Sequence, residues 1–161
     1  MTANEFNKAV DDYSDSIYRF ILKNIKDKDK ASDIVQDTYE KLWRRMEEVS
    51  YQKIKSYLFT AAYHTMIDVI RKDKKSDDFS SFDFNGYAHS SQYSDLQEVL
   101  HIALERLPNI QRSVILLRDY EGYSYQEIAE ITGLNESQVK VYIYRGRIFL
   151  KNYIGNIEAV I

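Results

Sequence analysis

The sequence contains no cysteine, one proline and five glycines among 161 residues. Without cysteine the chain has no disulfides, thiolate metal sites or thiol nucleophiles. No apolar run is long enough to cross a bilayer or to act as a signal peptide, so we expect a cytoplasmic protein. Strict alternation of apolar and polar residues over strand length is almost absent. Together with the scarcity of proline and glycine, this predicts an all-α protein.

Sequence signs of catalysis are also missing. There is no glycine-rich phosphate loop and no convincing Ser/His/Asp arrangement, which argues against a hydrolase or a transferase. The three histidines, His64, His89 and His101, are too scattered to indicate a metal site. We therefore expect neither an enzyme nor a bound cofactor or metal.

No large excess of either charge marks the chain, whose formal net charge is −3. Local charge matters more for nucleic-acid binding than net charge does. Residues 53–75 hold six cations against two acids, and residues 137–151 hold four cations and no acid. Each half thus has one basic element and a compensating acidic surface, which fits two DNA contacts and at least one protein contact.

Apolar residues recur at helical spacing along residues 1–75. A capping box of Thr2 and Glu5 predicts a first helix to about residue 26. A second helix is expected over about 30–48 and a third over about 53–74, and the three should form one bundle. The side chains that we expect the second helix to bury are Val35, Tyr39, Leu42 and Met46.

Residues 76–94 are rich in Ser and Asp, without a helical period, and predict a linker. A second small domain is expected over residues 95–161. It begins with a helix to about Leu107 and a second helix that has Pro108 in its first turn.

The stretch 124–151 predicts two short helices around a turn. Ser124 and Glu127 form a capping box, Gly133 ends the first helix, and Asn135 with Gln138 starts the second, which is basic. This is the layout of a DNA-binding helix-turn-helix. An ordinary amphipathic surface helix is the alternative, although these signals seldom occur together at this spacing.

The order of four segments resembles an extracytoplasmic-function (ECF) sigma factor of bacterial RNA polymerase. These segments are DIVQDTYEKLW (33–43), SYLFTAAYHTMIDVIRKDKK (56–75), ALERLPNIQRSVILLRDYEGYSYQEIA (103–129) and the basic helix. The resemblance implies a sigma-2 domain (1–75), a linker (76–94) and a sigma-4 helix-turn-helix domain (95–161). The linker is either a simple tether or, as the resemblance suggests, an acidic strand that enters polymerase channels in place of nucleic acid. The resemblance also implies core RNA polymerase, promoter DNA and a separate anti-sigma factor as partners.

The second predicted helix carries Asp33, Gln36, Asp37 and Glu40 at three- and four-residue intervals, opposite its apolar stripe. From the residues alone this is a solvated polar face. The resemblance implies more, because the first three match the family's D-x-x-Q-[DE] surface that docks on the polymerase clamp helices. Trp43 lies close by, and we expect it in the core rather than at the docking edge.

The third predicted helix combines aromatic side chains with a basic end, as expected of a surface that stacks unpaired bases and follows a backbone. Some of these aromatics belong to the core. The resemblance implies that this helix and the loop before it capture a base flipped from the melted minus-ten element. His64 stands where the family commonly has asparagine, so the preferred base does not carry over. The implied minus-ten residues are Tyr51, Tyr57, Tyr63, His64, Arg71 and Lys72.

The basic last helix matches the family positions that face the minus-thirty-five element. Arginine can read guanine bidentately in the major groove, whereas lysine and tyrosine more often anchor phosphates. Val141 replaces a polar residue of some relatives and can contact a thymine methyl group. The minus-thirty-five set is Lys140, Val141, Tyr144, Arg145, Arg147 and Lys151.

Two functions fit these patterns. The first is a sigma factor that directs core polymerase to promoters and assists their melting. The second is a free-standing helix-turn-helix regulator whose first domain binds a ligand or dimerises. The D-x-x-Q-D surface favours the first, because a simple repressor has no need of it.

Overall fold

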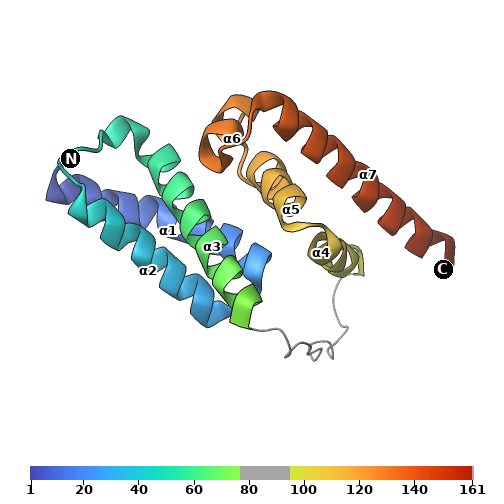
Figure 1. The fold of residues 1–161 in the computed structure, drawn as a ribbon. Helices are drawn as coiled ribbons and strands as arrows, with labels where there is room; N and C mark the ends of the chain where they lie inside the picture. The colour runs from blue at the N-terminus through green and yellow to red at the C-terminus, as the bar shows by residue number, and fades with distance from the viewer. Residues whose placement is uncertain (77–94, 161) are drawn as a thin grey trace.

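The computed structural model describes residues 1–76 and 95–160, and the side chains of residues 75, 76, 95 and 157–160 are left out of the description. Every regular element of this part of the chain is helical (Figure 1), so the all-α prediction is confirmed. The helices are α1 (Ala3–Ile25), α2 (Lys28–Arg44), α3 (Ile54–Ser76), α4 (Asp95–Arg106), α5 (Asn109–Ile115), α6 (Tyr125–Thr132) and α7 (Glu136–Val160). The predicted linker lies outside the described residues except for Ser76, and no described helix could span a membrane.

Helices α1, α2 and α3 pack together as the predicted bundle, here called the N-terminal unit. The α1 capping box is formed as expected, since the Thr2 hydroxyl accepts from the Glu5 N–H and the Glu5 carboxylate accepts from the Thr2 N–H. Its left-handed C-cap is Lys26, a non-glycine residue at φ 54°. Asp27 then caps α2 through the Lys30 N–H, which keeps the turn between the two helices short.

Helix α2 ends earlier than predicted and buries a different stripe. The Arg45 N–H closes back onto the Leu42 carbonyl at 3.1 Å, so the helix stops at Arg44 instead of about Glu48. Val35 and Met46, expected in the core, are only half-buried. The residues that α2 buries are Ala31, Ile34, Thr38, Tyr39 and Leu42.

Helices α4 to α7 form the C-terminal unit. Pro108 is the N-cap of α5, one position before the predicted first turn. A π-helical segment, η3 (Leu116–Tyr120), follows α5 directly. The core of the C-terminal unit combines aliphatic side chains of α5, η3, α6 and α7, which include Val114, Leu117, Ile128, Ile131, Val139 and Ile143.

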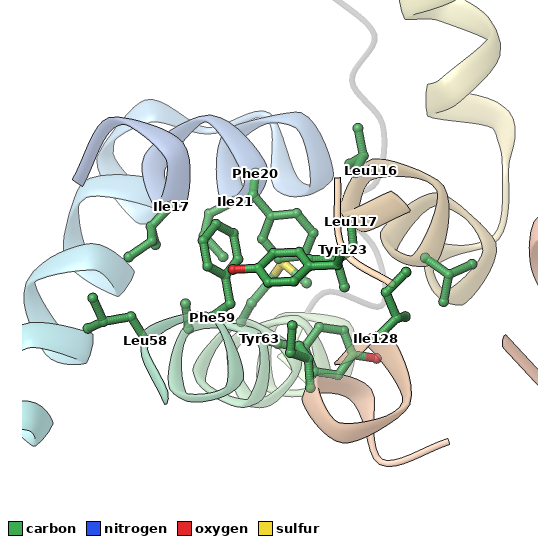
Figure 2. Close-up of a cluster of buried hydrophobic side chains, with 14 of the residues drawn as sticks. Ile17, Phe20, Ile21, Leu58, Phe59, Tyr63, Leu116, Leu117, Tyr123 and Ile128 are labelled. Carbon is green, nitrogen blue, oxygen red and sulfur yellow. The ribbon is translucent and has the colours of Figure 1, made fainter. Parts of the chain in front are cut away.

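The two units do not have separate cores. Their buried side chains join in one continuous hydrophobic cluster, and α3 packs against α6 (Figure 2). Figure 2 shows Tyr123, which precedes α6, reaching between α1 and α3 toward Phe20 and Phe59. A three-helix bundle of this size leaves apolar side chains on α1 and α3, and the C-terminal unit covers them.

Helix α7 passes very close to α5 at Gly146. An added Cβ there would lie 2.3 Å from Ile115 Cδ1, a buried atom, whereas an added Cβ at Gly155 meets nothing within 4 Å. Alanine raises helix propensity by roughly 1 kcal/mol over glycine. Overpacking opposes that gain at Gly146 by about 1–3 kcal/mol.

We expect Gly146→Ala to lower the free energy of unfolding by about 1 kcal/mol. Gly155→Ala, its matched control on the same helix, should instead raise it by about 1 kcal/mol. Urea unfolding followed by circular dichroism measures both changes. Equal stabilisation by the two substitutions would show that the Ile115 side chain moves aside at little energetic cost.

Candidate nucleic-acid interface

The helix-turn-helix is built by local hydrogen bonds that the sequence predicts. Ser124 and Glu127 form both bonds of a capping box, at 3.1 and 2.8 Å. Gly133 ends α6 in the left-handed region at φ 83°, where a side chain would be strained. Asn135 and Gln138 exchange two further bonds at 2.8 and 3.0 Å and start α7. The turn thus fixes the angle between the two helices.

All six residues of the predicted minus-thirty-five set are exposed on one side of α7. The opposite side holds the buried residues Val139, Ile143 and Gly146. Val141 and Tyr144 are 42% and 66% exposed, although a valine and a tyrosine at helical spacing usually face a core. The exposed side of α7 therefore combines cations with apolar contact surface.

Two edges of this α7 surface differ in their partners. At one edge, Arg147 forms a two-point ion pair with Asp119 of η3, with Nε to Oδ2 at 3.2 Å. This hydrogen bonding raises the pKa of Arg147. Lys140 lies over the Tyr125 ring at the same edge, with Nζ 5.6 Å from the ring centroid.

At the other edge, Arg145 and Val141 line a shallow concavity of about 310 Å³ together with Ser137 and Gln138. The guanidinium of Arg145 forms no ion pair in the described part of the chain, in contrast to that of Arg147. The Arg145 guanidinium is therefore open at this edge of α7, whereas Asp119 holds the Arg147 guanidinium at the other edge.

The predicted minus-ten residues are spread along α3 and the turn before it. Tyr51 and Tyr57 are half-buried, whereas His64 is exposed. Tyr63 is only 5% exposed, and its ring contacts that of His64 edge to face, with centroids 5.5 Å apart. Burial raises the pKa of Tyr63, and the charge of Arg71 partly offsets that rise.

The structure thus brings Tyr63 and His64 together but leaves only His64 open to solvent. Arg71 and Lys72 are exposed two turns further along α3. Figure 2 shows that the Tyr63 side chain lies beside Ile128 of α6, which belongs to the other unit. Part of the predicted surface for unpaired bases is therefore covered by the protein itself.

The polar residues of α2 form an open surface. Asp33, Gln36, Asp37 and Glu40 are all exposed, opposite the buried stripe of the helix. The expectation that Trp43 lies in the core is wrong. Its side chain is 55% exposed, and its ring packs against that of Phe6 in a T-shaped pair, with centroids 5.1 Å apart.

Some of the most connected polar residues were missed from the sequence. The Arg112 guanidinium donates to the carbonyls of Leu104 and Leu107 and, across the two units, to that of Asn24 at 2.8 Å. Burial lowers the pKa of Arg112. One arginine in an amphipathic helix carries no pattern that sets it apart from a solvated cation, so no signal in the sequence singles it out.

Known proteins resemble this chain along most of its length. The family model for Sigma-70 region 2 matches residues 9–76, and the model for Sigma-70 region 4 matches residues 97–150. RNA polymerase sigma factor SigV of Bacillus subtilis is 35% identical over 140 residues, which cover 85% of this chain and 83% of that protein. The ECF RNA polymerase sigma factor SigM of the same organism is 31% identical, covering 86% and 88%.

A solved structure has the same fold. The sigma factor RpoE of Bartonella quintana, in complex with the anti-sigma factor NepR, superposes with a TM-score of 0.75 and 28% identity. The match covers 95% of this chain and 98% of RpoE. It therefore includes both units.

Proposed function

Because this chain belongs to the ECF family of RNA polymerase sigma factors, which direct core polymerase to promoters, we propose which of its surfaces performs each part of that task. The α2 surface of Asp33, Gln36, Asp37 and Glu40 binds core polymerase. The α3 surface takes unpaired minus-ten bases, and the exposed side of α7 binds duplex minus-thirty-five DNA. The observation that carries the proposal is the pairing of an open acidic and amide surface on α2 with an open basic surface on α7.

The docking surface extends to Trp43. An exposed tryptophan beside a polar surface is a common energetic centre of protein interfaces, because its ring buries much area at little entropic cost. Trp43 follows Glu40 by three positions and so continues the same side of α2. We assign Trp43 to the docking edge, where it would insert into a polymerase pocket beside the carboxylates.

The double substitution Gln36→Ala with Asp37→Ala should weaken binding to core RNA polymerase by about tenfold. Both side chains are exposed, so the helical fold should stay intact. The measurement is pull-down of core polymerase with increasing amounts of protein, beside circular dichroism.

A control makes two alanine substitutions on another exposed surface, Asp11→Ala with Asp15→Ala on α1, and so removes one more negative charge than the tested variant does. This control should bind polymerase like the wild type. If the Gln36 and Asp37 variant also binds normally while folded, α2 is not the docking element.

On α3, we assign His64 to the pocket that holds an unpaired base. Arg71 and Lys72, near the end of the helix, contact the DNA backbone. His64 is exposed, and its ring rests against Tyr63, which fixes its position. On α7, Arg145 contacts a base edge from the open side of the helix. Lys140, Tyr144 and Lys151 contact phosphates, and Val141 offers its methyl groups to thymine.

A similar sigma factor also suggests how this protein is regulated. RpoE of Bartonella quintana was solved in complex with an anti-sigma factor, and this chain matches it over both units. We propose that an anti-sigma factor also binds this protein and releases it on a signal. Co-purification from the native host, with and without envelope stress, tests this directly: a partner lost under stress supports it.

A further inference from the structure

Asp119 is an acidic residue at the edge of the proposed DNA-binding surface of α7. Its two carboxylate oxygens accept from Nε and Nη2 of Arg147, the first at 3.2 Å. Such a two-point contact fixes the plane of a guanidinium as well as its position. The pair is open to solvent, with 38% of the Asp119 side chain and 48% of the Arg147 side chain exposed. A DNA phosphate can therefore compete with the carboxylate for the same cation.

The segment that carries Asp119 is anchored to the core of the C-terminal unit. Leu116 and Leu117, which precede it in η3, are buried. Arg118, its direct neighbour, donates to the Tyr123 carbonyl at 2.9 Å. These contacts fix the backbone around Asp119, so its carboxylate has a defined place beside α7.

The position of Arg147 on α7 indicates which part of a DNA duplex it would meet. Arg147 follows Lys140 by seven residues and precedes Lys151 by four, so the three side chains lie along one side of the helix. Lys140 and Lys151 are assigned above to phosphates. Arg145, assigned to a base edge, lies two positions before Arg147, and residues so spaced do not share a face. Released from Asp119, Arg147 would thus become a further phosphate contact.

We propose that Asp119 is a positioning residue that holds the Arg147 guanidinium away from the DNA backbone and so limits the sequence-independent part of DNA binding. Phosphate contacts carry no sequence information, and they supply nearly all of the affinity for non-specific DNA. Such DNA is in great excess over promoters, so each added phosphate contact holds the protein at more wrong sites. This proposal rests on the proposed role of α7 in binding duplex DNA.

Asp119→Asn tests the proposal, because it removes the charge and keeps the shape of the side chain. The probe is a fluorescent, mixed-sequence DNA duplex of about 20 base pairs, and anisotropy measures its binding to the whole chain over a series of salt concentrations. Asp119→Asn should bind about fivefold tighter at about 0.1 M salt and raise the salt dependence by about one ion. Asp119→Glu, which retains the carboxylate, should bind like the wild type.

Controls separate release of Arg147 from a general effect of charge. Asp11→Asn makes the same change in net charge at an exposed position of α1 and should bind like the wild type. Arg147→Gln should weaken binding about fivefold in the Asp119→Asn background but less than about twofold in the wild type, because only the released guanidinium reaches a phosphate. Circular dichroism confirms that each variant is folded.

The proposal is overturned if Asp119→Asn does not tighten duplex binding, or if Arg147→Gln weakens it equally in both backgrounds. The first result would leave the ion pair as a structural contact alone, and the second would mean that the two charges act independently. Lys151→Ala is scored separately. If Lys151→Ala also leaves binding of this duplex unchanged, α7 is not the DNA-binding surface, and the proposed function fails rather than the role of Asp119 alone.

Discussion

Phe59→Ala is expected to lower the free energy of unfolding by about 3–5 kcal/mol, the largest stability change among the substitutions considered. The ring is fully buried, 5.8 Å from Phe20 and 5.3 Å from Tyr123. Its removal leaves a cavity where the two units meet, since the rings around it come from α1, α3 and the segment before α6. Both units should therefore lose stability, although Phe59 belongs to only one of them.

Urea unfolding followed by circular dichroism measures this change. Phe149→Ala on α7 is the matched control, because that side chain is exposed and its loss should change the free energy of unfolding by less than about 1 kcal/mol. A loss below about 1.5 kcal/mol for Phe59→Ala would mean that the site collapses easily and that the joint cluster contributes little.

Arg145→Ala is expected to weaken recognition of the minus-thirty-five element by about 1–3 kcal/mol, because it would remove the major-groove base contact that we propose for Arg145. The guanidinium lies at the open edge of α7, without the ion pair that holds Arg147. The loss should depend on sequence, being large for the preferred element and small for a scrambled one. Competition binding of the polymerase holoenzyme to these two DNA fragments measures it.

Lys151→Ala provides the comparison on the same helix. Lys151 is exposed further along α7, six positions after Arg145. Loss of a phosphate contact there should weaken binding similarly for all sequences and reduce the salt dependence by about one ion. If both substitutions weaken DNA binding equally and independently of sequence, Arg145 does not contact a base.

The sequence predicts the helix-turn-helix well because its signals are local. Capping residues act on backbone groups three positions away, so Ser124 with Glu127 and Asn135 with Gln138 define helix starts without knowledge of the rest of the fold. The exposed surfaces on α2 and α7 follow from helical periodicity in the same way. Their roles in binding still stand as proposals.

Features that depend on contacts between distant segments were not predicted. Trp43 looks like a core residue in the sequence, yet α2 ends one residue after it and more than half of its side chain is exposed. Tyr63 and Phe59 form an apolar pattern that the bundle alone could explain. Nothing in that pattern reveals that their cover comes from α6, more than 60 positions later by the numbering of the chain.

This distance along the chain has a consequence during protein synthesis. Ribosomes add about 5–20 residues per second, so the α3 face is made several seconds before the α6 segment that covers it. In that interval the nascent N-terminal unit carries Phe59 and Tyr63 uncovered, beside an already complete α2 surface. During synthesis, polymerase or a chaperone can therefore bind the N-terminal unit before α6 covers Phe59 and Tyr63 of α3.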